Sequence, residues 1–158
     1  ARRSYSRLSP EARSCITFEN EEISHGLDTC LELADIVPVV LDVHHHWIRE
    51  GQYISPTDDR VKRVRDSWRG VRPAMHYSTS REDLLVDHAI HHRPEHASLL
   101  ESGHKKQKLR AHSDFCWNRA TNEWVLGFWQ DFDIQVEAKG KNLASEQLYN
   151  QAREMELV

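Results

Sequence analysis

The chain has few of the residues that mark secreted, membrane-spanning or broadly basic proteins. It has three cysteines among 158 residues (Cys15, Cys30 and Cys116), an odd number without metal-type spacing, so we expect no disulfide framework and favour a reducing cytoplasm. The longest apolar run, residues 36–41, is too short to cross a bilayer. A formal net charge of -4 excludes a broadly basic nucleic-acid coat, although it allows a local basic groove.

The start of the sequence suggests a piece of a longer protein. The chain begins with Ala1-Arg-Arg-Ser, without an initiator methionine and without the apolar stretch of a signal peptide. A length of 158 residues suits one domain or part of a larger one. We therefore treat residues 1–158 as a single domain and expect it to be a fragment.

Apolar periodicity along the chain predicts alternating strands and helices. Short β-branched or apolar runs predict strands at residues 15–19, 38–43, 73–77 and 133–138. Helical spacing predicts helices at residues 28–35, 57–70 with Thr57 as the N-cap, 80–88, 121–132 and 142–156, and residues 90–112 read as an irregular excursion. This alternation is typical of an α/β protein with about four βα units, parallel strands and crossover helices.

Residues that can bind a metal ion or move protons stand at the ends of the predicted strands. They are Glu19, Asp42, His76 and Glu137. The carboxyl ends of parallel strands meet on one face, where α/β proteins collect their catalytic groups. Any one of these residues could be a helix cap or a solvated loop residue, but the set of four predicts a shared site.

The segment Asp42-Val-His-His-His46 is the densest part of this site. Asp42 ends an apolar strand, where a bare carboxylate is costly unless it is paired or bound to metal. The spacing lets Asp42 and His45 reach one cation, whereas His44 and His46 would point elsewhere; the alternative is three loop histidines without a ligand role. Mixed oxygen and nitrogen ligands suit Mn²⁺, Fe²⁺ or Zn²⁺.

Basic residues gather further along the chain, within the excursion. Lys105, Lys106, Lys108 and Arg110 have no acidic residue between them and could contact DNA phosphates, although a solvated loop is the alternative. His112 could add another ligand. The remaining histidines of the excursion read as loop residues (His88, His91, His92 and His96), and Trp47 is the tryptophan expected near the site.

Five groups of motifs follow one another along the chain: Leu8-Ser-Pro-Glu11 with Thr17-Phe-Glu-Asn20, Val40-Leu-Asp-Val-His-His-His46, Ser67-Trp-Arg-Gly70 with Pro73-Ala-Met-His-Tyr-Ser78, Arg110-Ala-His-Ser-Asp-Phe115, and Asp133-Ile-Gln-Val-Glu-Ala-Lys-Gly-Lys141. In this order they resemble the C-terminal half of UV damage endonucleases. The resemblance implies part of a TIM (β/α)8 barrel and a DNA-repair enzyme that hydrolyses the phosphodiester bond 5′ to UV photoproducts in damaged double-stranded DNA.

The same resemblance implies a set of site residues and a metal. The metal ligands would be Glu19, Asp42, His45, His76, His112 and Glu137, of which Glu19, Asp42, His76 and Glu137 would be catalytic, and the metal would be Mn²⁺, with Mg²⁺ or Zn²⁺ as alternatives. The chain departs from the family at Ala74, where a lysine often stands. The family's other metal histidines and its lesion-probing residues belong to an N-terminal half that this sequence does not contain.

Two further interpretations stay open at this stage. One is a sugar isomerase or epimerase on a similar metal-binding barrel, and the other is a non-catalytic interaction domain with a decayed metal site. The basic stretch at residues 105–110 favours DNA over a neutral sugar. Half a barrel would also leave strand edges open at residues 15–19 and 133–138 and a hydrophobic inner face, so we expect the chain to self-associate.

Overall fold

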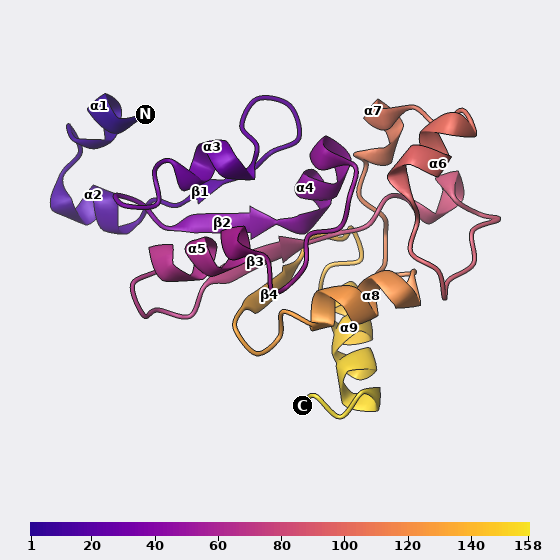
Figure 1. Cartoon of the computed structure of the whole chain (residues 1–158). Coiled ribbons are helices and arrows are strands. Elements are labelled where there is room, and N and C mark those ends of the chain that lie inside the picture. The colour runs from indigo at the N-terminus through magenta and orange to yellow at the C-terminus, as the bar shows by residue number, and fades with distance from the viewer.

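A four-stranded parallel sheet forms the centre of the computed structural model, which describes all of residues 1–158 (Figure 1). The strands lie side by side in chain order: β1 (Phe18–Glu19), β2 (Val39–Asp42), β3 (Ala74–Tyr77) and β4 (Asp133–Val136). All three neighbouring pairs are parallel. The predicted βα alternation and parallel pairing are therefore confirmed.

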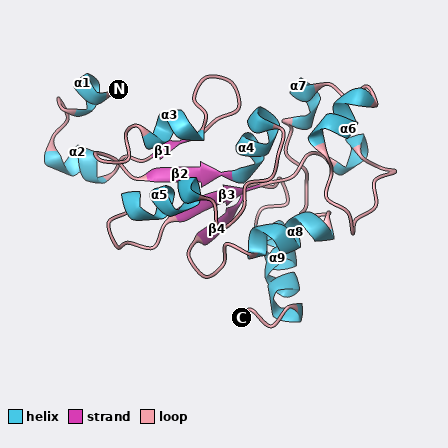
Figure 2. Cartoon of the chain, viewed as in Figure 1, coloured by secondary structure: helices cyan, strands magenta, loops and turns pink.

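Helices surround this sheet at its amino end, over one face and beyond its carboxyl end (Figure 2). In chain order they are α1 (Arg2–Tyr5), α2 (Pro10–Ser14), α3 (Leu27–Leu31), α4 (Val43–Glu50), α5 (Asp59–Ser67), the 3-10 turn η1 (Glu82–Leu84), α6 (His96–Glu101), α7 (Lys106–Leu109), α8 (Arg119–Leu126) and α9 (Asn142–Glu154). None of these helices combines the length and hydrophobicity that a membrane crossing requires.

The two faces of the sheet carry different side chains. Alternate residues of a strand point to opposite faces. Met75 and Tyr77 of β3 are fully buried in the main core, which contains side chains of α3, α5, α8 and α9. On the opposite face the strand register places Asp42 beside His76 and His76 beside Gln135. One face of the sheet therefore builds the core, and the other carries a polar row across three strands.

The core also holds buried polar groups with partners. The Tyr77 hydroxyl donates to Asn122 Oδ1 at 2.5 Å, and Asn122 Nδ2 donates to the carbonyl of Cys116 at 2.8 Å. Burial of an apolar side chain such as Met75 contributes about 1.5–3 kcal/mol. These contacts fix α8 against the core face of β3.

The sequence-based boundaries were wrong at several elements near the amino end. β1 has only two residues, because Pro10–Ser14 forms α2 and Cys15 caps that helix. The N-cap of α5 is Asp58 and not Thr57, since the Asp58 carboxylate accepts from the Arg60 N–H at 2.8 Å. The triple-histidine segment is not a loop but the first turn of α4.

The predictions for the second half of the chain also need correction. Residues 90–112 contain α6 and α7, so this segment is partly helical, and His96 is a buried helical residue. Only η1 forms within 80–88, and α8 ends at Leu126, well before residue 132. Asp133 and Gln135 are exposed on β4. The face of the sheet on which they lie is therefore polar at this strand, whereas the sequence predicted a hydrophobic inner face.

Candidate metal centre

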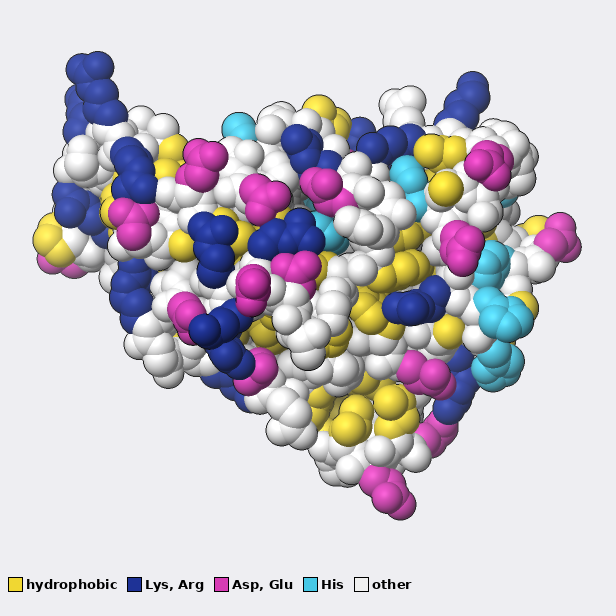
Figure 3. Space-filling model, in the orientation of Figure 1, with side chains coloured by type: hydrophobic (Ala, Val, Ile, Leu, Met, Phe, Trp, Pro, Cys, Tyr) yellow, Lys and Arg dark blue, Asp and Glu magenta, His cyan; other side chains and the backbone are white.

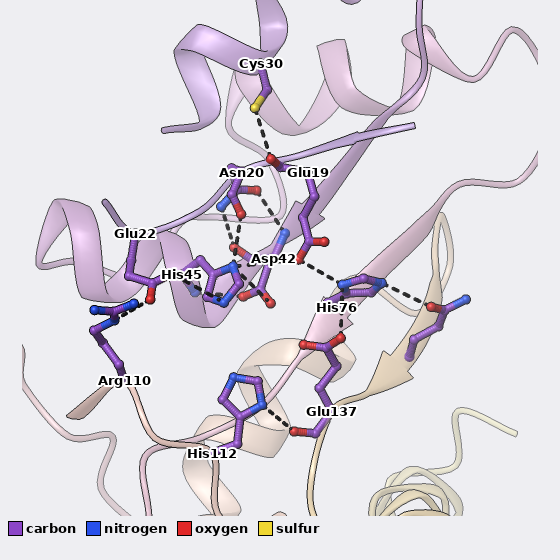
Figure 4. A network of polar contacts seen from close by, with 11 residues as sticks. Glu19, Asn20, Glu22, Cys30, Asp42, His45, His76, Arg110, His112 and Glu137 are labelled. Atoms are coloured by element: carbon purple, nitrogen blue, oxygen red, sulfur yellow. Dashed lines mark hydrogen bonds and ion pairs between the residues drawn. The ribbon is translucent and has the colours of Figure 1, made fainter. Parts of the chain in front are cut away.

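Four side chains at or just after the ends of the four strands meet at the carboxyl edge of the sheet (Figure 4). They belong to Glu19, Asp42, His76 and Glu137, and each offers one ligand atom within 4.8 Å of the others. Three carboxylates and one imidazole make a donor set of the kind that binds divalent transition metals. The structure thus brings together the four residues that the strand ends suggested.

The strand register accounts for this convergence. Glu19 ends β1 and Asp42 ends β2, and Asp42 pairs directly with His76 of β3. Glu137 follows β4, and its N–H donates to the carbonyl of Tyr77 at 2.8 Å, which extends the β3–β4 ladder by one residue. Neighbouring strands lie about 4.8 Å apart, so side chains at matching positions come within reach of one ion.

Asp42 is the most buried member of the cluster, with a relative exposure of 0%. Its Oδ1 accepts from the His45 N–H at 2.7 Å and so caps the start of α4, whereas its Oδ2 is buried without a hydrogen-bond partner. Burial raises the pKa of the Asp42 carboxyl group. Because a buried carboxylate oxygen without a hydrogen bond is unfavourable, a cation is a suitable partner for this atom.

His76 lies between two carboxylates and a side-chain amide. Its Nδ1 is 3.0 Å from Glu19 Oε1 and 3.4 Å from Glu137 Oε1. Its Nε2–H donates to Gln135 Oε1 at 3.1 Å, so Nδ1 is the ring atom that faces the cluster. The hydrogen bond to Glu19 raises the pKa of His76 to about 9. Burial pushes the pKa of Glu19 upward, but the contacts with His76 outweigh it and the net shift is downward.

His45 lies beside the cluster and points its two ring nitrogens at different partners. Nδ1–H donates to the main-chain carbonyl of Asn20 at 3.0 Å, while this atom is also 3.5 Å from Asp42 Oδ2. Nε2 lies 3.5 Å from Glu22 Oε2. Burial alone would lower the pKa of His45, yet the Asp42 carboxylate and its other partners raise it. His45 is thus adjacent to the four residues but outside their tight group.

His112 also stands next to the cluster and not inside it. Its Nδ1–H donates to the main-chain carbonyl of Glu137 at 2.7 Å, which leaves Nε2 as its lone-pair nitrogen. The centroids of the His112 and His45 rings are 6.3 Å apart. This placement puts His45 and His112 on one side of Asp42, as a flank to the central group (Figure 4).

His44 and His46 are buried and take no part in the cluster. The His44 ring stacks on Trp47 with centroids 5.8 Å apart, so Trp47 lies one ring away from His112, which His44 meets edge-on at 5.6 Å. Burial lowers the pKa of His44 to about 3. These two histidines therefore belong to the packing behind the site.

The basic stretch divides into exposed and paired residues. Lys105, Lys106 and Lys108 are exposed on and next to α7. Arg110 forms an ion pair with Glu22 and is partly buried, so its charge is already matched by a carboxylate. Figure 3 shows that Lys and Arg side chains are interspersed with acidic ones over the visible face, and histidines gather at one side of it.

Sequence reasoning missed three residues around the cluster: Asn20, Glu22 and Gln135. Asn20 binds the main chain of Asp42, Glu22 links His45 to Arg110, and Gln135 holds His76. Gln135 could have been found, because it lies two residues before Glu137 and so shares its face of β4. Asn20 and Glu22 act through contacts with distant segments, which no local pattern reveals.

Comparisons with known proteins agree with this geometry. The family described as UV-endonuclease UvdE matches residues 1–158. A UV-damage endonuclease of Schizosaccharomyces pombe is 27% identical over 150 residues, which cover 90% of this chain and 21% of that protein. A UV-damage endonuclease of Neurospora crassa is 33% identical over 90 residues, which cover 49% of this chain and 13% of the relative.

A solved structure matches the fold as well. The crystal structure of SacUVDE aligns with a TM-score of 0.70 at 19% identity, over 99% of this chain and 45% of that chain. The predicted fold, part of a parallel βα barrel, is thereby confirmed. The chain spans less than half the length of SacUVDE and about a fifth or less of the two curated relatives.

Proposed function

Because the chain belongs to the UvdE family of UV endonucleases, we propose that it carries the metal centre of a DNA-repair endonuclease. The proposed reaction is hydrolysis of the phosphodiester bond 5′ to UV photoproducts in double-stranded DNA. The observation that carries the proposal is the convergence of Glu19, Asp42, His76 and Glu137, together with the buried Asp42 oxygen that has no hydrogen bond.

The residues fit a divalent metal by a test that is independent of the family. One carboxylate oxygen of Asp42 is buried without a hydrogen bond, and Asp42 is one of four residues whose donor atoms lie within 4.8 Å of one another. Three carboxylates packed so closely with one imidazole suit a divalent cation. Glu19, Asp42, His76 and Glu137 would hold the ion, and His45 and His112 would complete the ligand set at the flank. Mn²⁺ is the proposed metal, with Mg²⁺ or Zn²⁺ as alternatives.

When bound, a divalent ion polarises the scissile phosphate, lowers the pKa of a water nucleophile and stabilises the departing 3′-oxygen. The chain's own residues prepare this centre. Gln135 accepts from His76 Nε2–H and so orients Nδ1 of that ring toward the carboxylates. The main-chain carbonyl of Glu137 accepts from His112 Nδ1–H and so leaves Nε2 of that ring as the free nitrogen. The exposed lysines near α7 would bind DNA phosphates outside the centre.

The alternatives left open by the sequence are less well supported. The matching relatives are UV-damage endonucleases, which favours DNA cleavage over sugar isomerisation. A decayed site would not be expected to keep four ligand groups converging from four separate strands. Damaged bases stack poorly, so extruding them costs less than extruding normal ones, which suits an enzyme selective for lesions.

The test has a binding arm and a cleavage arm. After treatment with EDTA, calorimetric titration of the chain with MnCl₂ should show saturable binding that His76→Ala abolishes and His91→Ala, at an exposed histidine, leaves unchanged. The longer protein that contains this chain should nick UV-irradiated supercoiled plasmid only with the metal present. Absence of Mn²⁺, Mg²⁺ and Zn²⁺ binding, or metal-independent nicking, would contradict the proposal.

A further inference from the structure

Asn20, the residue after β1, joins the two strand ends that carry Glu19 and Asp42. We propose that it is a positioning residue that sets the separation of these two carboxylates; this inference rests on the proposed function. Asn20 is 1% exposed, its Nδ2 donates to the carbonyl of Asp42 at 2.8 Å, and its Oδ1 accepts from the Asp42 N–H at 2.9 Å. The carboxamide thus binds both polar groups of one main-chain residue.

These two hydrogen bonds, which we call the Asn20 clamp, matter because β1 is short and lies at the edge of the sheet. Only Phe18 and Glu19 pair with β2, and no strand covers the other side of β1. Terminal residues of such an edge strand fray easily, because few hydrogen bonds hold them. A side-chain amide has the same donor and acceptor as a peptide group, so Asn20 adds a further rung to this two-residue ladder.

Asn20 also connects the cluster to its flank. Its main-chain carbonyl accepts from His45 Nδ1–H at 3.0 Å, which fixes that ring through the residue that clamps Asp42 (Figure 4). The preceding carbonyl, that of Glu19, accepts from Cys30 Sγ at 3.3 Å. Both polar atoms of the Asn20 side chain are taken up by Asp42, so Asn20 acts through its neighbours and not as a ligand.

Asparagine is the side chain that this geometry requires. Aspartate keeps an acceptor for the Asp42 N–H but places a carboxylate oxygen against the Asp42 carbonyl, where the amide now donates. Alanine removes both hydrogen bonds and leaves two main-chain groups of a buried residue unpaired. Either substitution should loosen Glu19 and Asp42 relative to each other without removing a ligand atom.

A matched control is available on the same strand. Ser67 is also buried, and its Oγ accepts from the Val39 N–H at 2.9 Å, at the opposite end of β2 from the cluster. Ser67→Ala therefore removes a buried side-chain bond to the β2 main chain without touching the metal-binding end. Any effect of general destabilisation should appear in this variant as well as in the Asn20 variants.

The experiment measures Mn²⁺ affinity by calorimetry in the EDTA-treated full chain. Asn20→Ala and Asn20→Asp should bind about 10–100-fold more weakly than the wild-type chain, the loss typical of residues that orient metal ligands. Ser67→Ala should lower the melting temperature and keep wild-type affinity. Wild-type affinity in a folded Asn20 variant, or an equal loss in Ser67→Ala, would overturn the inference; Asn20→Asp supplies the measurement if Asn20→Ala does not fold.

A second measurement separates this inference from the proposed function. In the metal-free chain, amide hydrogen exchange should show that Asn20→Ala exposes the Asp42 amide, while Ser67→Ala exposes the Val39 amide instead. A protected Asp42 amide in Asn20→Ala would overturn the clamp. A wild-type chain that binds no divalent ion would overturn the proposed function, and the exchange data would still decide whether Asn20 holds Asp42.

Discussion

Replacing Asp42 by asparagine should have opposite effects on stability with and without metal. The substitution is isosteric, and Oδ1 can still accept from the His45 N–H and cap α4. What changes is Oδ2, the buried oxygen without a hydrogen bond, which an amide NH2 group replaces. In the metal-free chain, Asp42→Asn should therefore be neutral or stabilising by about 1–3 kcal/mol, because a neutral amide is less costly to bury there than a carboxylate that faces Glu19 and Glu137.

With metal present the order should reverse. A ligand at 100 times its Kd stabilises the folded state by about 2.7 kcal/mol. For a chain of this length, each kcal/mol shifts the melting temperature by about 2–4 °C, so Mn²⁺ should raise that of the wild type by about 5–11 °C. Asp42→Asn removes the most buried ligand, and its melting temperature should hardly respond to Mn²⁺.

Thermal melts followed by circular dichroism, with and without MnCl₂ after EDTA treatment, measure both effects. The control is Asp58→Asn, because Asp58 caps α5 through the Arg60 N–H as Asp42 caps α4, yet lies outside the cluster. Asp58→Asn should keep the full response to Mn²⁺. An Asp42→Asn variant with a wild-type response would refute the assignment of Asp42 as a ligand.

Three further predictions concern the surface, acid stability and association. Changing Lys105, Lys106 and Lys108 together to alanine should weaken DNA binding and reduce the slope of log K against log salt by up to about 2.7, as measured by fluorescence anisotropy. Burial lowers the pKa of His96, so the unfolded chain binds a proton at this ring more readily than the folded chain does. The contribution of His96 to the free energy of unfolding should therefore fall as pH drops below about 6.5. Urea titrations of His96→Gln should show a weaker dependence of that free energy on pH. Light scattering should show self-association through the open edges of β1 and β4, and a compact, cooperatively unfolding monomer would refute this.

The strands were predictable because burial on the sheet leaves a local signature. Val39, Val40 and Leu41 are all buried, which is why β2 reads as a continuous apolar run. The same logic placed Asp42 at the end of this run and His76 at the end of the next strand. Ligand candidates at strand ends follow from topology alone, since parallel strands bring their carboxyl ends together.

The features that could not be predicted from the sequence involve residues with two roles or with partners far away along the chain. Asp42 was interpreted as a strand end and a metal ligand, so its second role as the N-cap of α4 was overlooked. Gly51 ends that helix in a left-handed conformation with φ 76°, and a glycine at this place was the sequence signal for a helix over residues 43–50. Arg110 reads as a free cation, but Glu22, 88 residues earlier, pairs with it. Such pairings become visible only when the fold places both segments side by side.

The register of the sheet determines which changes in chain length the metal centre can tolerate. Asp42, His76 and Gln135 occupy matching positions on three strands, and the residue before each of them faces the other way. One residue inserted into β3 before His76 would turn the imidazole into the hydrophobic core and bring an apolar neighbour out. Two inserted residues would restore the face but move the ring about 7 Å along the strand, beyond the reach of Glu19. In the connection between Tyr77 and β4, the restriction falls on His112, whose Nδ1–H is bound to the main-chain carbonyl of Glu137.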